Sequence, residues 1–150
     1  MKNLSVSTSK NIKVEKKIIH SLVTNLSNKL SFKLESLSIN FVDAEYLLNI
    51  NKDYLNHNFN TDIITFNYSG SNTLLDGELF ISVDEAINNS LKYKVTLDSE
   101  IIRLVIHGIL HLLGYDDEES SKKRKMKKEE DFYTELFEKE YKNIIVEYDY

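Results

Sequence analysis

The 150-residue sequence contains no cysteine, no proline, no tryptophan and only four glycines. Without cysteine, disulfides and thiolate metal sites are excluded, so any metal must be held by His, Asp, Glu or carbonyl oxygen. There is no run of 18 apolar residues, so no transmembrane helix is expected. Residues 1–14 mix polar and single apolar residues without a continuous apolar stretch, so no secretory signal is expected either. These absences favour a cytoplasmic protein without a membrane partner.

The length fits a single domain spanning residues 1–150. A net charge of −5 argues against a protein that coats nucleic acid with its whole surface. A local basic stretch is nevertheless present between residues 122 and 128. It is interpreted either as a solvated helix face or as an electrostatic guide for single-stranded RNA. Its members are Lys122, Lys123, Arg124, Lys125, Lys127 and Lys128.

Hydrophobic periodicity predicts an α+β fold with a small mixed four-stranded sheet and about five helices. The helices are expected over residues 12–30, 43–56, 84–92, 98–113 and 118–141, with Asp43 and Asp84 as N-caps. Strands are expected over residues 34–42, 63–68 and 79–83. The tail at residues 144–146 is either an added strand or frayed.

The expected fourth helix carries the residues that predict chemistry. It is apolar on nearly every side, yet Glu100, Arg103, His107 and His111 are spaced three or four residues apart and share one face. Two histidines at positions i and i+4 place their imidazoles where one metal ion can bridge them. A metal site at the end of a buried helix is therefore expected.

A third ligand can come from the turn that follows this helix. Gly114 lets the chain reverse, so that Asp116 or Asp117 can reach the imidazoles, and spacing alone does not choose between them. Two imidazoles and one carboxylate leave a position open for water, as catalytic metal sites require. Gly108 follows the first histidine, where H-E-x-x-H zinc proteases carry a glutamate. Protease chemistry is therefore disfavoured, and Gly108 suggests a close approach of backbone or substrate.

These residues resemble a known family. HGILHLLGYDD resembles the H-G-x-L-H-L-x-G-Y-D-H signature of the YbeY family of endoribonucleases, also called rRNA maturation factors. INKDYLNHNFNTDIITFNY is similar to the family segment L-N-x-x-Y-R-x-K-D-x-x-T-D-V-L-S-F, and GELFISV looks like its G-D-I-x-I-S strand. Met126 and Glu130 fit its M-x-x-x-E pattern. The resemblance covers roughly residues 40–137.

The resemblance implies an α+β fold, one zinc ion on three side chains, and single-strand RNA cleavage in the 3′ end maturation of small-subunit rRNA and in ribosome quality control. By position, the ligands are His107, His111 and, where the family has a third histidine, Asp117. Carboxylate oxygen is an ordinary zinc ligand, and this donor set also suits iron or manganese.

A second departure falls at a proposed catalytic position. The family's arginine is Leu55 here, and the following lysine and aspartate positions hold His57 and Asn58. Either Arg103 or His57 could take the role of facing the phosphate, but Arg103 could instead pair with Glu100. Asp62 matches the family's T-D and is expected either to order the strand near the site or to serve as a turn residue.

The preferred function is a metal-dependent endoribonuclease, in which the metal polarises a phosphoryl oxygen or acidifies a bound water. An alternative is a non-catalytic assembly factor with a structural metal, which would bind a ribosomal protein or a ribosome-associated GTPase. A metal-dependent protease or amidohydrolase is the third and least favoured hypothesis.

Overall fold

The computed structural model describes residues 1–149. Along the chain, the elements are β1 (Leu4–Thr8), β2 (Ile12–Val14), α1 (Lys16–Leu30), β3 (Lys33–Val42), α2 (Ala44–Leu55), β4 (Ile63–Asn67), β5 (Leu74–Ser82), α3 (Val83–Tyr93), α4 (Leu97–Leu112), α5 (Ser120–Glu138) and β6 (Ile145–Tyr148).

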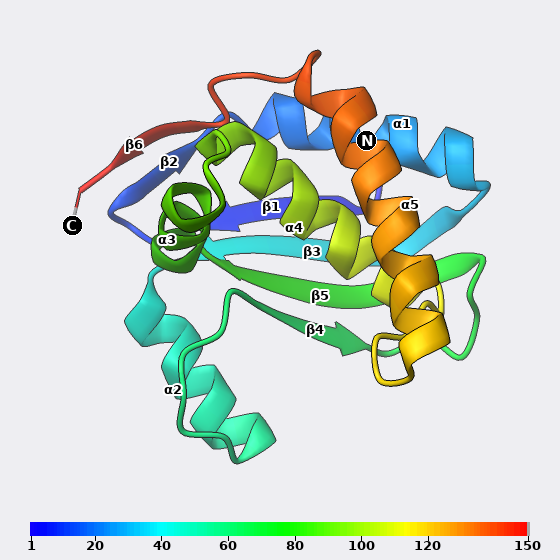
Figure 1. Cartoon of the computed structure of the whole chain (residues 1–150), viewed down its shortest axis with the longest axis horizontal. Helices are drawn as coiled ribbons and strands as arrows, with labels where there is room; N and C mark the ends of the chain where they lie inside the picture. The colour runs from blue at the N-terminus through cyan, green and yellow to red at the C-terminus, as the bar shows by residue number, and fades with distance from the viewer. Residues whose placement is uncertain (150) are drawn as a thin grey trace.

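The main sheet has four strands in the order β1-β3-β5-β4 (Figure 1). β3 runs parallel to both β1 and β5, whereas β4 pairs antiparallel with β5 and forms one edge. A separate two-stranded sheet joins β2 to β6. The predicted α+β fold with a mixed four-stranded sheet and five helices is therefore confirmed.

The two faces of the main sheet are covered differently. The large core lies on one face and takes residues from α1, α4 and the inward positions of the strands, among them Leu22, Leu79 and Val105. Neighbouring residues along a strand point to opposite faces. Accordingly, Ile64 of β4 joins a smaller cluster with Val42 and Leu47 on the face that α2 covers. The pocket described below lies where β4 meets α2 and α4.

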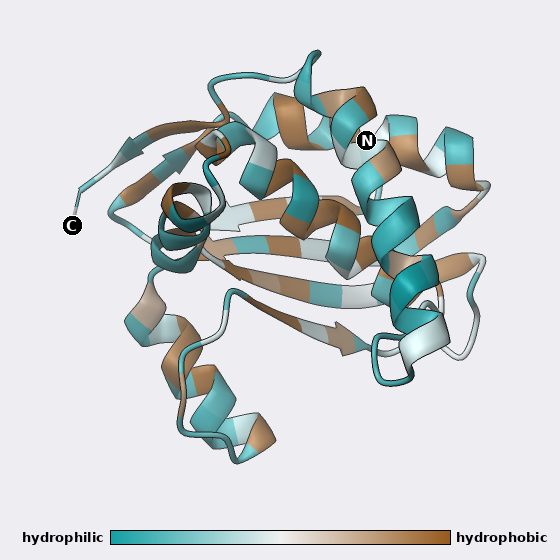
Figure 2. Cartoon of the chain, in the orientation of Figure 1, coloured by the Kyte–Doolittle hydropathy of each residue, from teal (hydrophilic) through white to brown (hydrophobic). Residues whose placement is uncertain are grey.

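Helix α4 is the central element, and most of its residues are buried, with apolar residues recurring along its length (Figure 2). Thr96 caps its start by accepting a hydrogen bond from the Ser99 amide. The chain turns beyond its end at Gly114, whose φ of 99° favours glycine. A Cβ at Gly108 would lie 2.7 Å from a methyl carbon of Leu79. At Gly108 the structure therefore shows close contact between α4 and a side chain of the sheet. This differs from the suggested approach of backbone or substrate.

Several details differ from the sequence-based predictions, among them the start of β5, which is Leu74 and not residue 79, and the extent of α5, which is Ser120–Glu138 and not 118–141. The first helix begins at Lys16, because residues 12–14 form β2, and β1 was not predicted. Ser82, not Asp84, caps α3, while the Asp84 carboxylate accepts a hydrogen bond from the Ala44 amide. The tail is a strand. Within residues 1–149, none of the helices is long and apolar enough to cross a membrane.

Candidate active site

Four of the sequence-predicted site residues line one pocket of about 310 Å³. His107 and His111 come from the second half of α4, Asp117 from the turn after it, and His57 from the loop after α2. Edge strand β4 supplies the base with residues such as Thr65. The structure therefore brings the two histidines, the carboxylate and His57 together from three separate segments.

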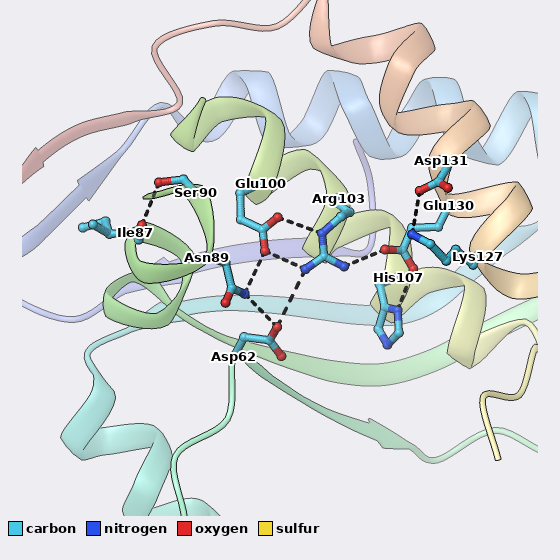
Figure 3. Close-up of polar contacts among 10 residues, drawn as sticks. All are labelled: Asp62, Ile87, Asn89, Ser90, Glu100, Arg103, His107, Lys127, Glu130 and Asp131. Carbon is cyan, nitrogen blue, oxygen red and sulfur yellow. Dashed lines mark hydrogen bonds and ion pairs between the residues drawn. The ribbon is translucent and has the colours of Figure 1, made fainter. Parts of the chain in front are cut away.

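The two α4 histidines have different surroundings. Their ring centroids are 6.3 Å apart. The Nδ1 atom of His107 lies 2.9 Å from Oε2 of the buried Glu130, which α5 supplies. Burial alone would lower the pKa of His107, but the hydrogen bond and charge of Glu130 outweigh burial and raise the pKa above its ordinary value. Figure 3 shows the second ring nitrogen directed away from this carboxylate.

Arg103 lies at the centre of a network of buried carboxylates (Figure 3). Its Nε and Nη2 atoms donate to Glu100 at 2.7 and 2.6 Å, and its Nη1 atom donates to Glu130 at 2.6 Å. Asn89 extends the network by donating to both Glu100 and Asp62. Burial would raise the pKa of Glu130, but hydrogen bonds from His107 and Arg103 hold that pKa below its ordinary value.

The guanidinium of Arg103 is therefore engaged by protein carboxylates. Of the two hypotheses made for this residue, the structure shows the ion pair with Glu100. Arg103 lines a different groove, between α4 and α5, from the pocket that holds the histidines. A role of Arg103 toward a phosphate stays a prediction. Asp62 both lines the pocket and pairs with Arg103 at 3.8 Å.

The two candidate aspartates face different directions. Asp117 lines the pocket with His107 and His111. Asp116 accepts a hydrogen bond from the Glu118 amide at 2.8 Å and lines a neighbouring cavity. The arrangement therefore favours Asp117 as a partner of the histidines and gives Asp116 a place in the turn.

The residues present fit a divalent metal by their chemistry. Two imidazoles and a carboxylate are an ordinary zinc donor set, and a carboxylate on the far nitrogen of a ligating histidine is the usual outer partner, as Glu130 is to His107. Within residues 1–149, however, no three His, Asp or Glu side chains are already gathered into a metal-binding cluster. The side chains of His107, His111 and Asp117 line one pocket, but they are not gathered around one point as in a formed metal site.

A buried asparagine fixes the loop after α2 where it lines the pocket. The backbone carbonyl of Asn51 accepts hydrogen bonds from the backbone amides of Asn56 and His57. Its side-chain amide donates a hydrogen bond to the backbone carbonyl of Phe59 at 2.8 Å. Asn51 is 2% exposed. This anchoring fixes the backbone of the segment that carries His57 and Phe59, which line the pocket together with Leu55 and the two histidines.

Comparison with known proteins places this geometry in a family. The model of the family described as Endoribonuclease YbeY matches residues 2–138. The chain belongs to the YbeY endoribonuclease family.

YbeY relatives from several bacteria match over most of their length. An Endoribonuclease YbeY from Karelsulcia muelleri is 44% identical over 108 residues, which cover 72% of this chain and 76% of the relative. One from Chlorobium limicola is 31% identical over 124 residues, covering 83% and 85%. A solution structure of a Thermotoga maritima protein has a TM-score of 0.65 at 23% identity, covering 88% of this chain and 87% of that one, and shows the shared fold.

Sequence patterns missed part of this YbeY-family site. Glu130 was matched to the family pattern without a role, and nothing singled out Asn51 or Asn89. The M-x-x-x-E pattern was the available signal for Glu130, because this residue lies 23 positions after His107 and belongs to a different helix.

The basic stretch of this YbeY-family protein lies on the first half of α5, where Figure 2 shows a strongly hydrophilic surface. All six of its cationic residues are exposed. Lys122 and Lys125 line the cavity beside Tyr115, next to the turn that carries the aspartates. A solvated face is therefore observed, and a role in binding RNA stays a prediction.

Proposed function

We propose that this protein is a single-strand-directed, metal-dependent endoribonuclease of the cytoplasm that acts in 3′ end maturation of small-subunit rRNA and in ribosome quality control. One observation carries the proposal: His107, His111 and Asp117 line one pocket, and Glu130 holds the first imidazole from behind. Membership of the YbeY endoribonuclease family supports RNA as the substrate.

One zinc ion would be held by His107, His111 and Asp117, with iron or manganese as other suitable metals. When bound, such an ion supplies Lewis-acid polarisation of a phosphoryl oxygen or lowers the pKa of a water. Glu130 fixes the orientation of the His107 ring through Nδ1. The second ring nitrogen, Nε2, is then left to bind a metal in the pocket. His57 lines the same pocket and could face a phosphate through a nitrogen in its ring plane, which leaves the face of the ring free for stacking; Leu55 stands where the family has arginine, and Arg103 is engaged by Glu100 and Glu130.

Metal analysis and RNA cleavage by the same preparations test this proposal. Wild type is expected to hold one transition metal per chain and to cut single-stranded RNA until a chelator removes the metal. Asp117→Ala should lose most of the metal and the cleavage, while the matched control Asp116→Ala should keep both. The reverse pattern would show that the third ligand is the wrong aspartate, and stoichiometric metal in His107→Ala or His111→Ala would contradict the site.

A second candidate is a non-catalytic assembly factor that binds a ribosomal protein or a ribosome-associated GTPase. The observation that favours it is the apolar Leu55, 40% exposed, where the family has a cation. Wild type that holds metal and binds such a partner, but never cuts RNA, would support this function over the nuclease.

A further inference from the structure

Two exposed aromatic rings form a stack at the mouth of the candidate active site. The rings of His57 and Phe59 have centroids 5.0 Å apart and an interplanar angle of 21°. Both residues line the same pocket as His107, His111 and Asp117. Phe59 is 57% exposed, so this phenyl ring is displayed at the pocket and not packed into a core.

The stack stands on a rigid base. Asn51 is almost fully buried, and its side chain donates to the carbonyl of Phe59 while its own carbonyl accepts the amide of His57. Both ends of the three-residue segment are therefore tied to the same point of α2. A platform held in this way loses little conformational entropy when a ligand covers it.

The pocket is lined by two chemically different groups of residues. The end of α2 and the loop after it supply apolar and aromatic side chains, Leu55, His57 and Phe59. Helix α4 and the turn after it supply the imidazoles and the carboxylate that suit a metal and a phosphate. A nucleotide has the same division, because its base offers an apolar π-face and its phosphate offers charged oxygens. The cavity of about 310 Å³ is at the small end of ligand pockets, which suits one nucleotide better than a folded segment.

We propose that the His57–Phe59 stack is a platform for one unpaired base of the RNA substrate, next to the phosphodiester that faces His107, His111 and Asp117. This inference rests on the proposed ribonuclease function. It assigns part of the preference for single strands to stacking, since a paired base in a duplex has no free π-face to offer. Stacking of this kind tolerates any base, so little sequence specificity is expected from it.

The absence of tryptophan in the sequence provides a direct assay. Phe59→Trp introduces a sole tryptophan at the platform, and Phe132→Trp introduces one at a matched control site on α5, where the native ring is 60% exposed. A single-stranded RNA oligonucleotide with 2′-O-methyl groups, which resist cleavage, should quench Trp fluorescence in Phe59→Trp but not in Phe132→Trp. An abasic oligonucleotide of the same length should quench the fluorescence of Phe59→Trp much less than the single strand does. A duplex should also quench it much less.

Affinity measurements separate stacking from charge. Phe59→Ala should weaken binding of the oligonucleotide about five- to twentyfold, with an unchanged salt dependence, because no phosphate contact is lost. Phe59→Tyr should bind within about twofold of wild type, and so should Phe132→Ala. Because the phenyl ring is exposed, thermal unfolding of Phe59→Ala should match wild type, which excludes misfolding as the cause.

Three outcomes would overturn the platform: unaltered affinity in Phe59→Ala, no quenching at position 59, or equal quenching by duplex and single strand. Its failure and that of the nuclease are distinguishable. If wild type cuts RNA while Phe59→Ala binds and cuts equally well, only the platform is wrong. If the metal-loaded protein never cuts RNA but single strands still quench the tryptophan at position 59, the nuclease is wrong and the platform stands.

Discussion

Replacing Arg103 by methionine should destabilise the fold more than it affects any contact with substrate. Arg103 is the shared cation of two carboxylates, Glu100 and Glu130, whose side chains are only 2% and 7% exposed. Removing one partner of a buried pair leaves an uncompensated charge and costs about 3–5 kcal/mol. In a domain of this size, each kcal/mol lowers the melting temperature by about 2–4 °C, so a decrease of roughly 6–20 °C is expected.

The loss should depend on pH in a defined direction. The pKa of Glu130 is held below its ordinary value of 4.5. Its contribution to stability is therefore present above pH 4.5 and is lost as the pH falls through the lower, folded-state value. Arg103 is one cause of that lowering, so the gap between wild type and Arg103→Met should be largest near neutral pH and should shrink below pH 4.5.

Urea unfolding followed by circular dichroism between pH 4 and 8 measures both effects. Arg103→Lys should recover only part of the stability, because a single ammonium nitrogen cannot donate two parallel hydrogen bonds to Glu100 while it also reaches Glu130. Lys127→Met is the matched control: its exposed pair with Asp131, at 3.4 Å, should cost less than about 0.5 kcal/mol. A decrease of less than about 1 kcal/mol in the free energy of unfolding of Arg103→Met would refute this account. Loss of RNA cleavage with intact stability would instead indicate that Arg103 contacts the substrate.

Three further predictions concern other parts of the molecule. In metal-free protein, the raised pKa of His107 means that its pair with Glu130 stabilises the fold below pH 6.5 and fades as the pH rises through the folded-state value; His107→Ala should therefore cost roughly 1–2 kcal/mol at pH 6 and less at pH 8.5 in urea titrations. Gly77→Ala should lose about 1–3 kcal/mol by the same assay, because the new Cβ would lie 2.6 Å from the backbone carbonyl of Phe66 in the neighbouring strand, and unchanged stability would contradict this contact. Triple replacement of the exposed lysines at the start of α5 by glutamine should weaken RNA binding and flatten its salt dependence with little change in melting temperature, whereas an unchanged salt slope would leave a merely solvated face; the residues are Lys122, Lys123 and Lys125.

The parts of the fold that local sequence determines could be predicted. The α2 cap is an example, since the Asp43 side chain accepts a hydrogen bond from the amide three residues on. The extent of α4 follows from its continuous apolar face and from the glycine beyond its end. By contrast, β2 has three residues and is a strand because of a partner about 130 positions away, which no local pattern specifies.

The site shows the same division. Spacing placed His107 and His111 on one face, and the family resemblance chose Asp117, which lines the pocket with them. The interactions of Arg103 could not be settled from sequence, because Glu130 comes from a different helix and reaches it only through the packing of α5 on α4. No sequence pattern singled out Asn51, because its role depends on how the loop after α2 folds back onto it.

The pairing of β2 with β6 has a consequence for the order of folding during synthesis. The amide of Glu15, immediately before α1, donates to the carbonyl of Ile144, and the amide of Ile144 donates to Asp98 in the first turn of α4. The beginnings of two central helices thus depend on a segment that is synthesised after all the helices described here. In a nascent chain arrested before residue 144, we expect α1 to be cleaved readily by proteases. Once the remaining residues are released, α1 should become protected.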